Sequence, residues 1–417
     1  METYLNHELP LIMHIDLNSC FATIEQQSKP SLRGRPVGVT NRISSNCCII
    51  AASIEAKALG VKVGMGRREA MNICPDIVVI ETDPPKIYWA YKNLLKIMSQ
   101  YSPDFKMKSI DEGLIDFHGQ EEILKGQSMR YIGYEIKQKL RENLGCWMRC
   151  NIGIGPNRFW AKTAAGLHKP DGLDEVNHKN MKRILESLEL TDLTGIAKKL
   201  EKRLLQHGIS SPLDFLEADK QLLAQVFKSK VHARHWYERL RGFEVDDFKT
   251  NQCQVGRQFV LDKPSNDDNS LWSRLQYLSQ TASMKLRFGG LEARGVYVWV
   301  VFQGGGYWHS SHKYQVAAYT DQEIFRRARE LFSARPRQTV TVIGVTCYGL
   351  EKTKTKQLTF DEQKINDRRL SSAVDDVNLR YGNFMLTYAD ALIGKKVIKQ
   401  KIPFGSTKFL DLLVSGQ

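Results

Sequence analysis

The sequence predicts an α+β protein with more than one domain. Over residues 1–178, strand-like and helical runs follow one another in the order strand, helix, strand, strand, helix, strand, with a glycine-punctuated insertion over residues 30–80. This order is typical of an antiparallel sheet backed by helices. Residues 180–247 then have an almost wholly helical pattern, and alternating strand and helix patterns return after residue 270.

The composition indicates a globular protein with a polyanionic partner. The 417 residues carry a formal net charge of +14, which favours nucleic acid as the partner, ahead of an anionic membrane surface. No apolar stretch has the length of a membrane span, and the N-terminus lacks a signal-peptide pattern. The eight scattered cysteines do not form a paired zinc framework. We therefore expect a cytoplasmic protein with reduced thiols and no membrane partner.

The first strand is predicted at Leu11–Ile15, and Asp16 follows it directly. A helix is expected from about Asn18 to Gln27, ended by Lys29-Pro30. A carboxylate between a strand end and a helix often holds a ligand. The same position also suits a simple helix cap, so both interpretations stay open.

A second acidic stretch, Ser109–Gly113, lies between two alternating runs, which predicts a β-hairpin that presents Asp111 and Glu112. Adjacent carboxylates repel each other unless a cation lies between them. Together with Asp16 they form the set of hard oxygen ligands that a two-cation site with bound phosphates requires. Asp-Glu-Gly is also ordinary turn chemistry, which is the alternative.

The remaining elements follow from periodicity and from turn residues. Helices are predicted at Ile54–Leu59, from Pro85, at Glu121–Asn143, and over 158–167, and strands at Val37–Val39 and Trp147–Ile154. After a polar stretch at 251–269, whose start we interpret as a linker, helices are predicted over 271–287 and 321–333, with strands over 296–301, 314–318 and 340–345. The highly charged residues 351–369 are interpreted as a tail or a linker, and one helix is expected in the last fifty residues.

Four stretches carry a family resemblance, and they occur in order along the chain: Asp16–Phe21 (DLNSCF), Ala51–Lys57 (AASIEAK), Ser109–Glu112 (SIDE) and Gly153–Lys162 (GIGPNRFWAK). Together they resemble the Y-family translesion DNA polymerases, above all the bacterial branch of SOS mutagenesis. The resemblance is strong over about residues 10 to 250 and looser beyond. It implies a low-fidelity DNA polymerase, a mutator acting in the response to DNA damage and in DNA repair.

The resemblance implies the division of the chain into domains of a right-hand polymerase. A ferredoxin-like palm would comprise residues 1–29 and 83–178, with small fingers at 30–82 between its two parts. A helical thumb at 179–248 would precede an α/β little finger at 249–350. Residues 351–417 would form a C-terminal tail.

The resemblance also implies the chemistry of nucleotidyl transfer. Asp16, Asp111 and Glu112 would be the catalytic acids, and with the backbone carbonyl of Leu17 they would bind two Mg²⁺ ions. The substrates would be primer–template DNA and deoxynucleoside triphosphates. Competing hypotheses are a non-catalytic polymerase-like protein that binds DNA and recruits partners, and a nucleotide cyclase on a similar palm. The presence of all three acids argues against the first, and the helical hairpin and the basic charge argue against the second.

Four residues are implied to bind the nucleotide: Phe21, Lys57, Arg158 and Lys162. Phe21 would be an aromatic steric gate under the sugar, although it could instead be a core residue packed with Ile24. Lys162 lies one helical turn after Arg158, so both would face the triphosphate, unless they only form a solvated helix face.

The sequence departs from the family pattern at two positions. The family usually has Tyr and Arg where Ile54 and Lys57 stand, so triphosphate binding is expected to be weaker unless Asn46, Ser53 or Lys62 compensates. Cys20, beside the steric gate, is smaller than the aromatic residue common there and would leave a roomier floor under the base.

Two further segments are implied to bind partners. Gly195, Ala197, Lys198 and Lys199 resemble a helix-hairpin-helix that holds a DNA backbone, and an ordinary interhelical turn is the alternative. Gln357, Leu358 and Phe360 resemble a peptide that docks on the sliding clamp, although the usual pattern has one more apolar residue before the aromatic.

Overall fold

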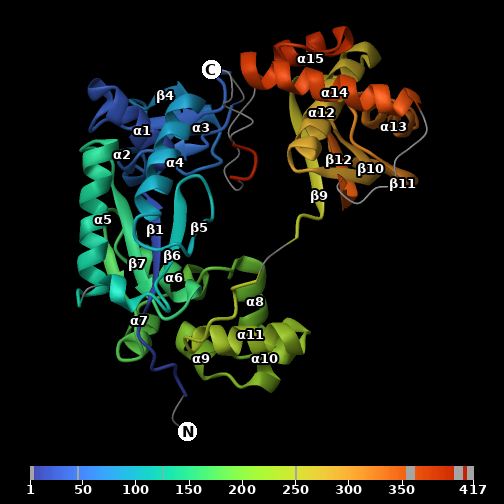
Figure 1. Ribbon diagram of the computed structural model, residues 1–417. Helices are drawn as coiled ribbons and strands as arrows, with labels where there is room; N and C mark the ends of the chain where they lie inside the picture. Colours follow the sequence, from blue (N-terminus) through green and yellow to red (C-terminus); the bar gives the residue numbers. More distant parts are fainter. Residues whose placement is uncertain are drawn as a thin grey trace. The chain divides into compact units, whose positions relative to one another are not determined.

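The computed structural model describes residues 4–44, 47–124, 126–248, 251–353, 362–398 and 407–410 (Figure 1). The chain divides into two compact units, with the boundary between Phe248 and Lys249. In the described residues, no helix has both the length and the apolar character needed to cross a membrane.

The first unit is built on a five-stranded sheet in the order β5-β6-β1-β7-β8. Its strands are β1 (Ile12–Leu17), β5 (Phe105–Met107), β6 (Glu112–Asp116), β7 (Cys150–Gly155) and β8 (Leu173–Glu175). The predicted acidic hairpin is confirmed, because β5 and β6 pair antiparallel around residues 108–111. Strand β1 lies at the centre and is antiparallel to both β6 and β7. This central position explains its run of buried apolar residues.

Helices cover both faces of this sheet. They are α1 (Cys20–Ser28), α4 (Pro84–Met98), α5 (Met129–Leu144) and α6 (Arg158–Leu167). Leu173 and Ile152 contact α5 at Gly133, whereas a Cβ on Gly153 would lie 2.1 Å from the Ala161 carbonyl oxygen of α6. Because neighbouring residues of a strand point to opposite faces, α5 and α6 lie on opposite sides of the sheet.

The predicted long helix at Glu121–Asn143 is in fact interrupted. A 3₁₀ turn (η2, Glu121–Leu124) precedes α5, and the two are separated by Gly126, whose φ of 75° a helix cannot accommodate. Helix α5 then begins at Ser128, whose hydroxyl accepts a hydrogen bond from the Tyr131 N–H at 3.2 Å.

A small three-stranded sheet and two short helices interrupt the chain between α1 and α4. The strands are β2 (Val37–Thr40), β3 (Ala51–Ala52) and β4 (Val78–Glu81), in the order β3-β2-β4, with a 3₁₀ turn (η1, Pro30–Leu32) and helices α2 (Ile54–Ala58) and α3 (Arg67–Ile73). The core of this subdomain includes Ile49, Ala52, Ala56, Ala70 and Ile77.

Residues 181–240 are helical as predicted. They form α7 (Met181–Glu186), η3 (Leu190–Asp192), α8 (Lys198–Gln206), α9 (Pro212–Glu217), α10 (Lys220–Phe227) and α11 (Lys230–Leu240). The rings of Phe215, Phe227 and Trp236 pack together in their core. Trp160 of α6 joins this core, and its indole N–H donates to the Leu240 carbonyl at 3.0 Å.

The second unit contains a four-stranded antiparallel sheet in the order β11-β10-β12-β9. Its elements are β9 (Gln254–Ser265), α12 (Asp268–Phe288), β10 (Leu291–Phe302), β11 (Tyr307–Ala318), α13 (Asp321–Phe332) and β12 (Val340–Lys352). Residues Gln254–Ser265 of the polar stretch 251–269 therefore form a strand, and only the start of the stretch, which was interpreted as a linker, precedes that strand. Its polar composition reflects an edge strand in which mainly Val255 and Leu261 are buried.

The prediction of a C-terminal tail over 351–417 is wrong for residues 362–398. They form α14 (Glu362–Tyr381), η5 (Ala389–Ala391) and α15 (Leu392–Val397), which pack on the second unit. Asp375 accepts two hydrogen bonds from Arg287, at 2.6 and 2.8 Å, and the Phe384 ring lies 5.0 Å from that of Tyr277. Asp375 of α14 is thus an ion-pair partner of Arg287 on α12.

Candidate functional site

A cleft of about 600 Å³ opens where β1 ends. Five parts of the chain line it: the β1–α1 junction, the β3–α2 segment, Val63, the hairpin residue Asp111, and the Lys169-Pro170 turn. The predicted site residues on its wall are Asp16, Leu17, Phe21, Lys57 and Asp111. Lys169 also lines it, although the sequence analysis did not identify it as a site residue.

The strand register brings the acids together. Asp16 is the direct cross-strand partner of Glu112 on β6 and of Asn151 on β7. Partners in register share a face, so Asp16 and Glu112 lie on the α6 side of the sheet. Asp111 directly precedes β6, and its carbonyl accepts a hydrogen bond from the Leu17 N–H at 2.9 Å.

The three carboxylates differ in their electrostatic environment. Burial, together with the negative charges of Asp16 and Glu112, raises the pKa of Asp111, although the Ser109 hydroxyl donates to it. Glu112 has the opposite shift, because its contacts with His14 (3.3 Å) and with the Lys162 ammonium (2.9 Å) lower its pKa to about 2. Burial and like charges therefore disfavour the ionised form of Asp111, whereas Glu112 is stabilised in its ionised form.

Lysines provide the compensating charge. Lys169 forms an ion pair with Asp16, and Lys162 bonds both carboxylate oxygens of Glu112. Burial, and then the charge of Lys169, lower the pKa of Lys57. Within the described residues, no group of three or more His, Cys, Asp or Glu side chains is arranged to hold a metal ion by itself. The donor chemistry nonetheless fits a divalent cation, because the hard oxygens of three carboxylates lie close together. Two of these carboxylates, Asp16 and Glu112, are also paired with lysine side chains.

The residues around the predicted steric gate are ordered by α1 and α2. Phe21 is 3 % exposed and lies on the cleft wall beside Cys20, whose pKa is raised by burial and then by Asp111 and Asp16. Ile54 also lines the cleft. Ser53 does not compensate for it, because it is fully buried, does not line the cleft, and its hydroxyl donates to the Arg35 carbonyl while accepting from the Ala56 N–H as the cap of α2. Of the other residues considered, Lys62 does not line the cleft, and Asn46 lies outside the described residues.

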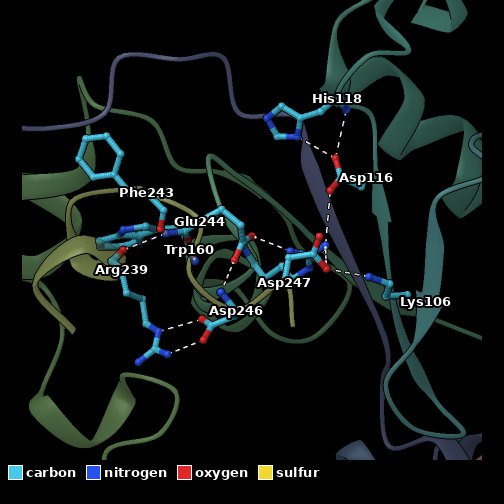
Figure 2. A network of polar contacts seen from close by, with 12 residues as sticks. Lys106, Asp116, His118, Trp160, Arg239, Phe243, Glu244, Asp246 and Asp247 are labelled. Atoms are coloured by element: carbon cyan, nitrogen blue, oxygen red, sulfur yellow. Dashed lines mark hydrogen bonds and ion pairs between the residues drawn. The ribbon is translucent and has the colours of Figure 1, made fainter. Parts of the chain in front are cut away.

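Arg158 does not face the cleft, contrary to the prediction. Its side chain is 5 % exposed and contacts Asp116 (3.5 Å), Glu244 (3.1 Å) and Asp247 (2.9 Å). Figure 2 shows these three acids converging from β6 and from the segment after α11, with Lys106 reaching Asp247. The first turn of α6 is capped by Asn157, so Arg158 is turned toward this segment while Lys162 reaches Glu112.

The predicted hairpin before α8 has the local geometry that was expected. Gly195 has a φ of 97°, Ala197 is the N-cap of α8, and the ammonium-bearing Lys198 and Lys199 are exposed in its first turn. The predicted clamp peptide with Gln357, Leu358 and Phe360 lies outside the described residues.

Two family models match the chain. The impB/mucB/samB family matches residues 15–166, and the C-terminal domain of that family matches residues 252–360. The first match contains the whole acidic cluster, and together the matches cover more than half of the chain. The chain belongs to the Y-family of DNA polymerases. It is a DNA-directed DNA polymerase of the translesion type, and enzymes of this kind need a divalent metal ion.

Relatives and solved structures of the Y-family agree with this assignment. A DNA polymerase IV of Pelotomaculum thermopropionicum is 28% identical over 399 residues, covering 94% of this chain and 97% of the relative. A DNA polymerase IV of Moorella thermoacetica is 29% identical over 400 residues, or 93% and 97% of the two chains. A chimera of the Y-family polymerases Dbh and Dpo4 has the same fold, with a TM-score of 0.69 at 20% identity over 82% of this chain and 99% of that one. None of these comparisons supports the non-catalytic alternative.

Arg158 and Lys162 both belong to α6 but contact different residues, and this difference leads to a prediction. Arg158→Met should destabilise this Y-family polymerase by about 2 kcal/mol, because it removes the buried cation that three partly exposed carboxylates contact. It should leave the KM for nucleotide unchanged. The matched control is Lys106→Met, which removes the other, more exposed partner of Asp247 and should cost less than about 1 kcal/mol. Urea unfolding and steady-state kinetics would check both values, and a raised KM with unchanged stability would place Arg158 at the triphosphate instead.

Proposed function

We propose that the chain extends a DNA primer on a template strand by two-metal-ion nucleotidyl transfer, with low fidelity and past lesions. The substrates are primer–template DNA and deoxynucleoside triphosphates. The observation that carries this proposal is the convergence of Asp16, Asp111, Phe21 and Lys57 on one cleft, with Glu112 paired to Asp16 across the sheet.

We assign the domains of a right-hand polymerase to the elements of the fold. The palm is the five-stranded sheet with its helices, at residues 1–29 and 83–178. The fingers are the small subdomain at 30–82, the thumb is the helical region at 179–248, and the little finger begins at residue 249. The division between the two compact units after Phe248 supports the last boundary.

Asp16, Asp111, Glu112 and the backbone carbonyl of Leu17 are the proposed ligands of two Mg²⁺ ions. When bound, such ions activate the primer hydroxyl and neutralise the departing pyrophosphate. The raised pKa of Asp111 supports this role, because burial and then the charges of Asp16 and Glu112 disfavour its ionised form, and a bound cation would stabilise that form.

Lys57 and Lys162 are the proposed contacts to the triphosphate. Lys57 lines the cleft, where burial and then the charge of Lys169 lower its pKa, and an incoming polyanion would stabilise its charged form. Lys162 is bonded to Glu112, and phosphate oxygens would compete with that carboxylate for the same ammonium group. Ile54 contributes an apolar surface to the cleft. A side chain with a hydrogen-bond donor at this position would bind phosphate more strongly than isoleucine does.

We propose that the hairpin before α8, which includes Gly195, Lys198 and Lys199, binds the DNA backbone. The N–H groups at the start of α8 are not engaged by a side-chain cap. Such N–H groups, together with the nearby charges of Lys198 and Lys199, suit a phosphate, and Gly195 lets the strand approach closely. Contacts of this kind are independent of base sequence and should weaken steeply with salt.

Substitution of the three acids Asp16, Asp111 and Glu112 provides the decisive test of this function. Asp16→Ala, or Asp111→Ala together with Glu112→Ala, should lower primer extension with Mg²⁺ by about 100-fold or more, because charge stabilisation at the reacting phosphate is lost. Affinity for primer–template should hardly change. Asp76→Ala, which removes an exposed acid away from the cleft, is the control. Normal extension by the cleft variants in a gel assay would refute the assignment.

The position of Phe21 predicts how the polymerase selects its sugar. A ring on the cleft wall excludes a 2′-hydroxyl by bulk, so Phe21→Ala should insert ribonucleotides far more readily, whereas Phe21→Tyr should retain the selection. Ile24→Ala is the matched control, since Ile24 is also buried on α1 but does not line the cleft. Side-by-side insertion of ribo- and deoxyribonucleotides measures the ratio. An unchanged ratio in a destabilised Phe21→Ala protein would assign the ring to the core alone.

On the basis of the sequence pattern alone, we propose that the chain is tethered to the sliding clamp. In this proposal Gln357, Leu358 and Phe360 occupy a groove on the clamp. Deleting residues 357–360 should abolish stimulation of synthesis by the clamp and leave synthesis without the clamp unchanged. Retention of full stimulation would contradict this location.

A further inference from the structure

His14 is a buried polar residue on the same face of β1 as Asp16. It lies two residues before Asp16, and its register partners are Leu114 of β6 and Gly153 of β7. Side chains two residues apart share a face of a strand, so the imidazole lies on the side of the sheet that α6 covers. Only 3% of His14 is exposed, and it does not line the cleft. The ring is therefore enclosed between the sheet and the helix.

The polar contact of this ring is the carboxylate of Glu112. Nε2 of His14 lies 3.3 Å from Oε2 of Glu112. The carboxylate has a pKa of about 2, so it is ionised at neutral pH and can only accept hydrogen bonds. The imidazole must therefore carry a proton on Nε2 for this contact to be favourable.

The contact is not an aligned hydrogen bond while Lys162 also holds the carboxylate. Within the described residues, Nε2 of His14 has no hydrogen bond of ordinary geometry, although it is buried. The Lys162 ammonium bonds both oxygens of Glu112, at 2.9 and 3.1 Å. A small rotation of the carboxylate toward the imidazole would give the buried N–H its partner, whose absence costs free energy. Hydrogen bonds of this kind are often poorly aligned in an unliganded enzyme and tighten when substrate binds.

The two partners of Glu112 differ in how easily they can leave it. The side chain of Lys162 is 40% exposed and is a proposed contact to the triphosphate, so incoming phosphates would draw it away from the carboxylate. His14 belongs to the central strand, beside Gly153, where a Cβ would lie 2.1 Å from the Ala161 carbonyl oxygen of α6. Such close packing leaves the imidazole little room to move. His14 therefore stays beside Glu112 when Lys162 leaves.

We propose that His14 is a positioning residue, which holds the Glu112 carboxylate in the orientation that binds a divalent cation. This deepens the proposed function, on which it rests, by naming a residue behind the metal ligands that acts through one of them. A flexible carboxylate loses rotamer freedom when it binds a cation, and a buried donor fixes its orientation in advance. Because the imidazole donates to one oxygen, the other oxygen remains available to the cation.

The first test measures metal binding separately from catalysis. Mn²⁺ affinity is measured by electron paramagnetic resonance in a complex with deoxynucleoside triphosphate and a primer that ends in a dideoxynucleotide, so that no bond forms. His14→Phe keeps a ring but removes the donor, and it should weaken Mn²⁺ binding at least about tenfold, the usual loss when the partner of a metal ligand is removed. His14→Gln places an amide N–H near the position of Nε2 and should recover most of the affinity. The matched control is Ile12→Ala, which changes a buried residue on the same face of β1 and should leave Mn²⁺ affinity unchanged.

The second test examines the contact itself in the protein without metal, nucleotide or DNA. In isotope-labelled protein, the Nε2–H resonance of His14 is identified by its loss in His14→Phe. Glu112→Gln should move this resonance toward weaker hydrogen bonding, because the charged acceptor is lost. Lys162→Met should move it the opposite way, because the carboxylate is then free to turn toward the imidazole.

The outcomes separate positioning from packing. Unchanged Mn²⁺ affinity in His14→Phe would overturn the proposal, as would an equal loss in Ile12→Ala or a resonance that ignores Glu112→Gln. A loss that His14→Gln does not recover would assign His14 to packing alone. Neither test uses primer extension, so a wild-type protein that binds Mn²⁺ but extends no primer would refute the proposed function without altering these results.

Discussion

Strand β1 is hydrogen-bonded along both of its edges, and the geometry of the site depends on this double pairing. The register with β6 and β7 fixes which face Asp16 occupies. A slip of one residue would turn Asp16 toward α5 and away from Glu112 and Lys162. The close approach of α6 to Gly153 and Gly155, where a Cβ would meet backbone atoms, holds the sheet and the helix in one relative position. The cleft is therefore a consequence of how the core packs.

This arrangement places like charges together at a cost in stability. Asp16, Asp111 and Glu112 repel one another, and the fold offsets the repulsion with Lys169 and Lys162. Lys162 is also a proposed contact to the triphosphate. The site therefore illustrates a frequent compromise, in which groups arranged for a charged substrate form ion pairs with one another within the fold.

The sequence predicted most of the elements and the location of the acids, because both follow from local patterns. The runs around Asp16 and Asp111 alternate clearly, and α4 buries Ile87, Leu94 and Met98 as its periodicity indicated. The site contacts were harder to predict. The orientation of Arg158 depends on Asp116, Glu244 and Asp247, which lie 42 to 89 positions away in the sequence. The pairing of Lys169 with Asp16 likewise spans 153 positions.

The errors at the C-terminal end have the same physical origin. Strand β9 and helix α14 are rich in polar residues, and a polar segment read alone resembles a linker or a tail. Their burial comes from partners elsewhere, such as Arg287 for Asp375 and β12 for β9. Local composition reports how much apolar surface a segment carries, and it contains no information about distant ion-pair partners.

The indole ring of Trp299 on β10 lies directly over Gly344 of β12. This contact constrains how the second unit can change in evolution. Any side chain at position 344 would collide with the indole, so the glycine is required only while the ring is present. Tyr348 over Gly295 forms a second couple of the same kind. Each ring and its glycine should therefore be inherited as a pair, and lineages that lose the ring should become free to place larger residues on the neighbouring strand.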